Sequence, residues 1–307
     1  MSGLISFIGA GPGAADLITL RGADRLRTAD VVIWASSLVP EAVLSHARPT
    51  ASIHDSATMT LEDVLSVYED HADGAIVRLH SGDPAIYGAI QEQLDWCIAH
   101  DRSFEIVPGV SSLAAAAAVV ERELTIPQVA QSVVITRLAS RTSTSMPERE
   151  TLPAFAATGC TLAVFLSAAR PTALQEELLG PTSAYGPDTP AAIVVRASWP
   201  DEQVVRTTVG NLANALVDTG ATTTVLVLVG PALAGAAPRS HLYSPTFAHK
   251  FRKRSRAGTT TGRAAGMGRN AEGRNVEDRD TEGRNVAGRA TTGAAHESTR
   301  SPAPGPG

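Results

Sequence analysis

The chain has 307 residues, of which 43% are hydrophobic and 19% charged, and this is enough for a large core divided between roughly two domains. No stretch approaches the ~20 consecutive apolar residues of a membrane span, and no basic segment followed by an apolar one opens the chain. The two cysteines have neither metal-ligand spacing nor a disulfide framework. We therefore expect a cytoplasmic protein that is neither embedded in a membrane nor secreted.

Apolar, β-branched runs alternate with helical patterns along the first 250 residues. The runs predict strands at residues 4–8, 31–34, 75–79, 104–107, 132–136, 161–165, 191–195 and 224–229. Helical periodicity predicts helices at residues 61–71, 85–100, 113–121 and 170–179. This alternation is typical of an α/β protein with two sheets, and continuous apolar strands favour parallel pairing. We predict an N-terminal α/β domain over residues 1–113 and a C-terminal α/β domain over residues 114–249.

The end of the chain differs from the rest in charge and composition. Residues 250–307 hold 12 of the 26 Lys and Arg but only 6 of the 31 Asp and Glu, so this end is basic and the preceding part is acidic. No aromatic residue follows Phe251. Because such a segment cannot bury enough apolar surface to offset its ordering entropy, residues 250–307 are predicted to be a disordered, low-complexity tail. Arginines in such tails are usually solvated, so no nucleic-acid partner is expected.

The first predicted strand leads directly into Gly9-Ala10-Gly11-Pro12-Gly13, which with Ala14 matches the spacing of a dinucleotide-binding turn. Three features argue against that function. Pro12 lacks an N–H for a pyrophosphate, and the helix is expected to begin after Thr19 as N-cap rather than at the glycines. Asp30 precedes the second strand, whereas a ribose-binding acid would follow it. An NAD(P)-binding oxidoreductase is kept as the alternative from another enzyme class.

Three other predicted strands end in loops of small, hydroxyl-bearing and proline residues, at residues 80–88, 107–112 and 166–169. Ligands of open α/β sheets bind at the carboxyl ends of the strands, and small residues let the backbone approach a ligand closely. The loops contain few charges, and Asp83 is a natural partner for a ligand amine or hydroxyl. The sequence therefore predicts a ligand site where these loops meet.

Gly9–Gly13 (GAGPG), Ser81–Gly88 (SGDPAIYG) and Val107–Ser112 (VPGVSS), in this order, resemble the signatures of the tetrapyrrole (corrin/porphyrin) methyltransferase family over about residues 3–250. The resemblance implies two domains, each a mixed, mainly parallel sheet flanked by helices, with the active-site cleft between them. It also implies S-adenosylmethionine (SAM) as methyl donor and a homodimer. Residues 35–41, 54–60, 109–112, 185–188 and 196–202 resemble the branch that methylates C11 of precorrin-4 in cobalamin biosynthesis, with cobalt-precorrin-4 or another ring position as alternatives.

The resemblance also implies which residues contact the ligands. Matched by motif, the SAM contacts would be Pro12, Ser81, Gly82, Asp83, Ile86, Ser111, Ser112, Leu166 and Ala197. The family often has Gly where Ser81 stands and Met or another apolar residue where Leu166 stands. The first glycine-rich loop is associated in the family with the tetrapyrrole as well, which makes Gly11 and Gly13 candidate substrate contacts.

A tetrapyrrole with many carboxylates needs local arginines, because the body of this chain is acidic. Candidates near the predicted loops are Arg21, Arg78, Arg137 and Arg196, although Arg21 fits an exposed helix face equally well. Trp34 and Tyr87 are candidates for stacking on the macrocycle, against the alternative of half-buried packing.

Methyl transfer from a sulfonium needs positioning and desolvation more than acids and bases, and the sequence has no arrangement of nucleophile and base. The catalytic residue therefore stays unknown, with His80 as a weak candidate for proton transfer and a histidine packed at a strand end as the alternative. His54 and Asp55 are neighbours without a third ligand, so no metal site is predicted.

Overall fold

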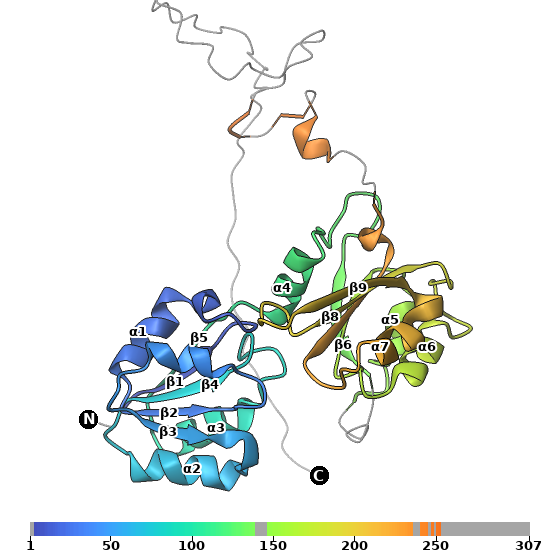
Figure 1. Ribbon diagram of the computed structural model, residues 1–307. Coiled ribbons are helices and arrows are strands. Elements are labelled where there is room, and N and C mark those ends of the chain that lie inside the picture. The colour runs from blue at the N-terminus through green and yellow to red at the C-terminus, as the bar shows by residue number, and fades with distance from the viewer. Residues whose placement is uncertain (1–2, 139–145, 236–239, 245–246, 249, 253–307) are drawn as a thin grey trace, which may run out of the picture. The chain divides into compact units, whose positions relative to one another are not determined.

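The computed structural model describes residues 3–138, 146–235, 240–244, 247–248 and 250–252. Residues Met1–Ser244 form one compact unit that contains two five-stranded sheets (Figure 1). The domain boundaries after residues 113 and 249 stay predictions, and residues 253–307 of the predicted tail lie outside the described residues. In the described part of the chain, no helix has the length and apolar character needed to cross a membrane.

The first sheet is parallel throughout and has the strand order β3-β2-β4-β1-β5. Its strands are β1 (Ile5–Gly9), β2 (Val31–Trp34), β3 (Ser52–Asp55), β4 (Ile76–His80) and β5 (Phe104–Val107). One face packs against α1 (Leu20–Thr28), and the other packs against α2 (Leu61–Asp70) and α3 (Gln91–Ala99) (Figure 1). The loops after the neighbouring strands β1 and β4 therefore lead to opposite faces, and α/β sheets bind ligands at such a position. We call the region between these loops the crevice.

The second sheet is mixed and has the strand order β6-β7-β10-β8-β9. Its strands are β6 (Val133–Arg137), β7 (Thr161–Phe165), β8 (Pro190–Val195), β9 (Gln203–Thr208) and β10 (Val225–Val229). Only β6 and β7 pair in parallel, so the predicted mainly parallel pairing holds for the first sheet and not for the second. Because β10 runs antiparallel between β7 and β8, strands β6, β7 and β8 share one direction, and their carboxyl ends lie at one edge.

Helices cover both faces of the second sheet with different side chains. The larger core lies under α5 (Leu152–Ala156), α6 (Pro171–Leu178) and α7 (Leu212–Asp218). The opposite face packs against α4 (Ser112–Val119), whose Ala115 and Ala116 belong to the same core cluster as the small strand residues Ala163 and Ala192. Short 3-10 helices occur at Ala15–Leu17, Glu41–His46, Ser56–Thr58, Val209–Asn211, Pro231–Leu233 and His241–Tyr243.

The structure contains all eight predicted strands, and those at 31–34, 104–107 and 161–165 have the predicted bounds. It adds the edge strands β3 and β9, whose residues are mostly exposed or half-buried and so lack a continuous apolar run. The helix predicted at 85–100 begins only at Gln91, because Tyr87 and Ala89 have φ of 55° and 49°. Thr19 is the N-cap of α1 as predicted, with its hydroxyl accepting a hydrogen bond from Gly22 N at 3.1 Å.

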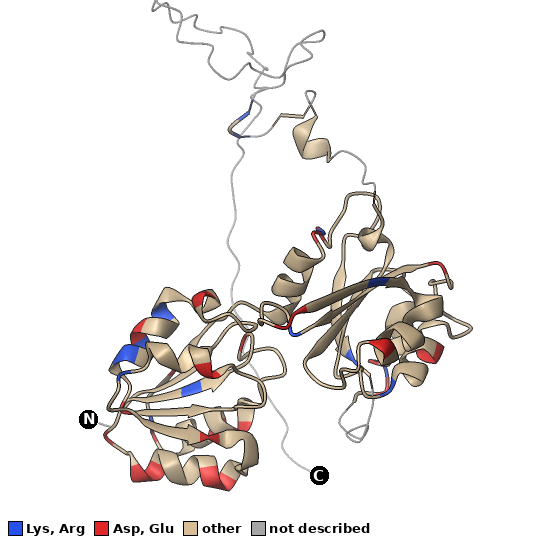
Figure 2. Cartoon of the chain, in the orientation of Figure 1, with Lys and Arg blue, Asp and Glu red and all other residues tan. Residues whose placement is uncertain are grey.

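Many of the charged residues lie on the helices that flank the sheets (Figure 2). In the first sheet's helices, α2 carries Glu62, Asp63, Glu69 and Asp70 and has no basic residue, whereas α1 carries three arginines. The loops at the carboxyl ends of the strands contain few charged residues, as the sequence predicted.

Candidate functional site

The crevice between β1 and β4 is closed at its base by backbone hydrogen bonds between two glycines. Gly11 N donates to Gly82 O at 3.3 Å, and Gly82 N donates to Gly11 O at 2.8 Å. Both residues have positive φ, 81° and 66°, which residues with a Cβ rarely adopt. The GAGPG and SGDPAIYG loops therefore continue the pairing of the two strands beyond the sheet.

The VPGVSS loop joins them through a second glycine contact. A Cβ on Gly109 would lie 2.1 Å from Gly82 O and 2.6 Å from Gly9 Cα, so the three backbones meet where side chains cannot fit. The Asp83 carboxylate accepts hydrogen bonds from Gly109 N at 2.9 Å and Ala85 N at 2.8 Å. These glycines are thus required by the contact of the loops with one another, whereas the sequence had indicated close approach to a ligand.

The first loop has few backbone donors left for a phosphate. Ala10 N donates to His80 O, Gly11 N to Gly82 O and Ala14 N to Ser198 Oγ, while Pro12 has no N–H. α1 begins only at Leu20, so its N-terminus does not reach this turn. The geometry therefore agrees with the sequence argument against a dinucleotide-binding turn.

The residues predicted to contact SAM fall into a buried group and a partly exposed group. Pro12, Gly82 and Ala197 are buried, as are the predicted substrate contacts Gly11 and Gly13, so these residues shape the walls of the site and expose little surface to a ligand. The others are partly exposed around the crevice: Ser81, Asp83, Ile86, Ser111 and Ser112. Ser111 is also the N-cap of α4, and its hydroxyl accepts a hydrogen bond from Leu113 N at 3.2 Å.

The end of β7 lies beside the SGDPAIYG loop. The rings of Tyr87 and Phe165 are 5.3 Å apart, and both Tyr87 and the next residue of β7's loop, Leu166, have positive φ of 55° and 51°. Leu166 is 64% exposed, which is unusual for a large apolar side chain held in a strained conformation. Burial raises the pKa of the Tyr87 hydroxyl, with the Arg137 charge acting in the opposite direction. An exposed apolar residue and a half-exposed aromatic ring thus lie together at the edge of the crevice.

The end of β8 contacts the first loop. Trp199 Nε1 donates to Pro12 O at 2.9 Å, and Ser198 Oγ accepts from Ala14 N at 3.0 Å. The sequence analysis placed Trp199 only within residues 196–202, and the structure shows that its side chain contacts the first loop of the same chain. The signal that pointed to it was the position of the RASWPDE stretch directly after a strand, on the edge that carries the other loops.

The arginine candidates are not gathered into one cluster. Arg196 pairs with Asp201 and lies 5.8 Å from the Trp199 ring centre. Arg21 is exposed in the first turn of α1. Arg78 is half-buried in β4 and donates to the carbonyls of Ile33 and Leu79. Arg137 ends β6, and its charge lowers the pKa of the Tyr87 hydroxyl against the larger effect of burial.

His80 lies beneath the crevice and not in it. Its side chain is 7% exposed, its ring centre is 6.2 Å from that of Phe7, and its Nε2 has no hydrogen-bond partner among the residues that the structure describes. Burial, with a contribution from Arg78, lowers the pKa of His80 to about 3. This placement corresponds to the packed histidine of the sequence analysis, because a neutral imidazole with so low a pKa exchanges no proton near neutral pH.

Two further features lie outside the crevice. Trp34 is half-buried at the end of β2, where its carbonyl accepts a hydrogen bond from Ser56 Oγ at 2.9 Å. Within the described ranges, no group of three or more His, Cys, Asp or Glu is placed to hold a metal ion.

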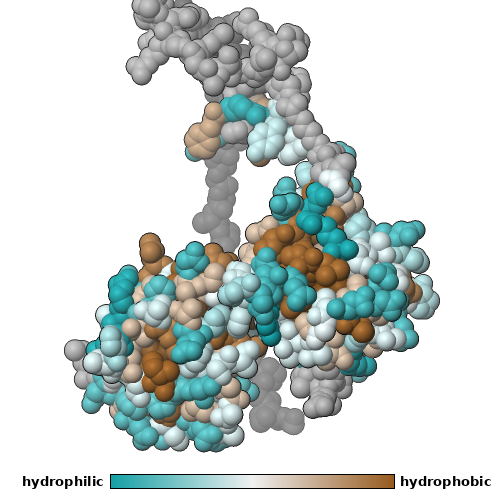
Figure 3. All heavy atoms as spheres, viewed as in Figure 1, coloured by the Kyte–Doolittle hydropathy of each residue, from teal (hydrophilic) through white to brown (hydrophobic). Residues whose placement is uncertain are grey.

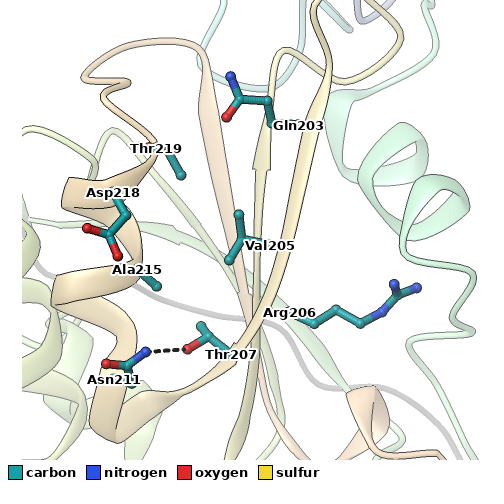
Figure 4. A pocket seen from close by; sticks show the side chains of 8 residues that line it. All are labelled: Gln203, Val205, Arg206, Thr207, Asn211, Ala215, Asp218 and Thr219. Atoms are coloured by element: carbon teal, nitrogen blue, oxygen red, sulfur yellow. Dashed lines mark hydrogen bonds between the residues drawn. The ribbon is translucent and has the colours of Figure 1, made fainter.

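A pocket of about 230 Å³ lies between β9 and α7 (Figure 4). Gln203, Val205 and Thr207 line it from β9, and Arg206 points to the other side of the strand, where it donates to Val120 O. Its lining shares no residue with the predicted site, and its volume is below the roughly 300–1,000 Å³ of ordinary ligand pockets. The pocket therefore gives no support to the predicted methyl-transfer site.

Comparison with known proteins identifies relatives over most of the chain. The model of the family described as tetrapyrrole (corrin/porphyrin) methylases matches residues 4–213. A precorrin-4 C(11)-methyltransferase of Sinorhizobium sp. is 46% identical over 253 residues, which cover 81% of this chain and 98% of that protein. A cobalt-precorrin-4 C(11)-methyltransferase of Priestia megaterium is 42% identical, over 80% of this chain and 96% of that protein.

Solved structures agree with the sequence matches. The crystal structure of a cobalt precorrin-4 methyltransferase, a cobalamin biosynthetic enzyme, superimposes with a TM-score of 0.72 at 41% identity, covering 76% of this chain and 96% of that one. A uroporphyrin-III C-methyltransferase of Thermus thermophilus, solved in complex with S-adenosyl homocysteine, has a TM-score of 0.61 at 26% identity, covering 74% of this chain and 92% of that one.

Proposed function

The chain belongs to the tetrapyrrole (corrin/porphyrin) methylase family, and on this premise we propose that it transfers a methyl group from SAM to C11 of precorrin-4 in cobalamin biosynthesis. The observation that carries the proposal is the identity of 41–46% with enzymes named for this ring position, over 76–81% of this chain and nearly the whole length of those enzymes. Relatives named for precorrin-4 and for cobalt-precorrin-4 are similarly close, so the experiment below includes both substrates.

The residues of the crevice fit a methyl donor of this kind. When bound, SAM supplies a methyl group that is activated by its own sulfonium charge. The chain offers hydroxyl groups from Ser81, Ser111 and Ser112 for polar contacts, and the exposed Leu166 side chain for apolar cover. Asp83 fixes the spacing of two loops through Gly109 N and Ala85 N, and a carboxylate that accepts two hydrogen bonds retains lone pairs for a ligand.

The proposed chemistry needs no protein nucleophile. In this transfer the C–S bond of the sulfonium would break with its electron pair left on sulfur, while the new bond forms to an electron-rich carbon of the macrocycle. The methylated macrocycle would then lose a proton, which balances the charge it receives. The protein's contribution is to hold the two reactants in line and to exclude water, which is what rigid loops and a mostly uncharged crevice provide. The neutral, buried His80 takes no part in this step.

We further propose that the enzyme acts as a cytoplasmic homodimer. Figure 3 shows hydrophobic side chains gathered over α4 and the adjoining part of the second sheet. Ala114 and Ala118 of α4 are exposed, and Leu113 and Val119 are only partly buried. Exposed apolar patches of this kind mark interaction surfaces. Sedimentation should show a dimer that A118E converts to a monomer, while the control V217E, on the exposed face of α7, remains dimeric; a monomeric wild type would contradict the proposal.

The ring position is tested by product analysis. The purified chain is incubated with SAM labelled with ¹³C at its methyl group and with precorrin-4 or cobalt-precorrin-4 in separate reactions, and NMR locates the label. We expect a methyl group at C11 and one S-adenosylhomocysteine (SAH) per product. A label at another carbon would contradict the assignment. Binding of NAD(P)H without binding of SAH in calorimetry would instead favour the oxidoreductase alternative.

A further inference from the structure

We propose that Trp199 is a positioning residue for the methyl transfer, acting through the GAGPG loop rather than by touching the reactants. The inference rests on the proposed function. It rests on two hydrogen bonds that join the outer part of this loop, Pro12–Ala14, to the segment after β8 of the second sheet.

The contact between the indole and the loop is close and specific. Trp199 Nε1 donates to Pro12 O at 2.9 Å, and Ser198 Oγ accepts from Ala14 N at 3.0 Å. A Cβ on Gly13 would lie 2.2 Å from Trp199 Cδ1 and 3.0 Å from Ala197 O. Gly13 is therefore glycine because the indole occupies the space of a side chain, although its φ does not require glycine.

The segment that presents the indole is itself held in an unusual conformation. Arg196 and Ser198 have φ of 49° and 66°, in the left-handed region that costs residues with a Cβ on the order of 1–3 kcal/mol each. Local contacts fix this shape: Ser198 N donates to Glu202 Oε2 at 2.6 Å, and Arg196 pairs with Asp201. Strained backbone conformations persist where surrounding contacts hold them in place. Here the resulting conformation places the Trp199 indole against Pro12.

The other two loops of the crevice do not depend on the second sheet in this way. Gly82 and Gly109 contact each other within the first sheet, and Asp83 joins their loops. Pro12 donates no hydrogen bond, and its buried carbonyl is left without a partner if the indole N–H is removed. Trp199 thus couples the second sheet to the outer part of the GAGPG loop, whose inner part, Ala10 and Gly11, is held by backbone hydrogen bonds to His80 and Gly82.

The test separates the N–H from the ring. W199F keeps a ring beside Gly13 and loses the donor to Pro12 O, W199A loses both, and W96F is the matched control in α3, where Trp96 contacts Tyr68 and His100. Calorimetry measures the affinity for SAH, and thermal unfolding measures Tm. Steady-state kinetics gives kcat and the KM values for SAM and for the tetrapyrrole. We expect a KM for SAM and a Kd for SAH about tenfold higher in W199F and about a hundredfold higher in W199A. The KM for the tetrapyrrole should stay within twofold in W199F.

A double-mutant cycle tests whether the effect passes through Gly13. G13A should raise the SAH Kd at least tenfold in the wild type, because the new Cβ meets the indole, and less than threefold in W199A, where the space is free. The positioning role would be overturned if G13A raised the SAH Kd by the same factor in the wild type and in W199A. It would also be overturned if W199F kept the wild-type SAH Kd and KM for SAM, or if Tm fell in W199F with unchanged SAH affinity. None of these results would contradict the proposed function. A wild-type chain that binds no SAH would contradict the proposed function as well.

Discussion

The loops of the two sheets reach the crevice by different physical means. Those of the first sheet meet through glycines, with Gly9, Gly82 and Gly109 in direct backbone contact. In those of the second sheet no such glycine contact is found among the described residues; Leu166 and Ser198 have positive φ, as Tyr87 of the first sheet also does, and Ser198 Oγ accepts a hydrogen bond from Ala14 N. A glycine contact is visible in a sequence as a motif, whereas a strained non-glycine residue has no such mark. Sequence motifs therefore identify the loops of the first sheet, whereas the contribution of the second sheet is recognised only from the packing of the folded chain.

The largest effect is expected from adding one methyl group to the glycine contact. G109A places a Cβ 2.1 Å from Gly82 O, so two loops must separate. We expect a loss of stability of about 3 kcal/mol, the upper end for overpacking, and an SAH affinity at least a hundredfold lower. The control is G186A, because a Cβ at Gly186 meets no atom within 4 Å. If G109A and G186A had the same Tm and the same SAH affinity, the contact between Gly109 and Gly82 would not be needed for stability or for binding.

A smaller loss is expected when the glycine contact stays and the side chain that secures it is removed. D83A deletes the acceptor of Gly109 N and Ala85 N, and hydrogen bonds to a charged group are worth about 1.5–3 kcal/mol. SAH affinity should fall about ten- to a hundredfold in calorimetry. D70A, which removes an exposed carboxylate of α2, is the control. An SAH affinity in D83A equal to that in D70A would take Asp83 out of the site.

The pH dependence of stability tests the placement of His80 under the first sheet. Its folded pKa of about 3 lies below the ordinary value, so between pH 7 and 5 the unfolded chain takes up a proton that the folded chain does not. Stability should therefore fall as pH falls through 6.5, by roughly 2 kcal/mol down to pH 5 from this residue. Urea unfolding of the wild type and H80N at both pH values measures the difference in slope. An NMR titration of His80 with a pKa near 6.5 would contradict its buried placement.

The smallest effect is expected at Leu166, on the second sheet's side. L166A leaves the backbone strained and removes a side chain that is 64% exposed, so stability should change by less than about 0.5 kcal/mol. If the side chain covers SAM, SAH affinity should fall several-fold. V217A, at a residue that is 65% exposed on α7, should change neither quantity. Unchanged SAH binding in L166A would remove Leu166 from the cofactor contacts.

Sequence reasoning succeeded where the signal is local. The strands at 31–34 and 161–165 are buried apolar runs, and the Thr19 N-cap depends on one side chain and its own helix. The edge strand β9 was missed because its residues are half-exposed and lack an apolar run. The antiparallel insertion of β10 was missed because a buried apolar strand reads the same in either direction.

The same distinction applies to the site. The loops after β1, β4, β5 and β7 were found as motifs at strand ends, and the structure brings them to one crevice. The contact of Trp199 with Pro12 joins residues 187 positions apart, and only the folded chain shows it. The burial of His80 depends on the helices packed over β4, which its neighbours in sequence do not reveal.

Hydrogen exchange with and without SAH tests the central claim most directly, because it reports where the methyl donor's product binds along the whole chain. The account predicts slower amide exchange in residues 81–88, 109–113 and 166–168, and unchanged exchange in residues 203–219, which line the pocket between β9 and α7. Protection confined to residues 203–219, with none in the three loops, would contradict a methyl-donor site in the crevice.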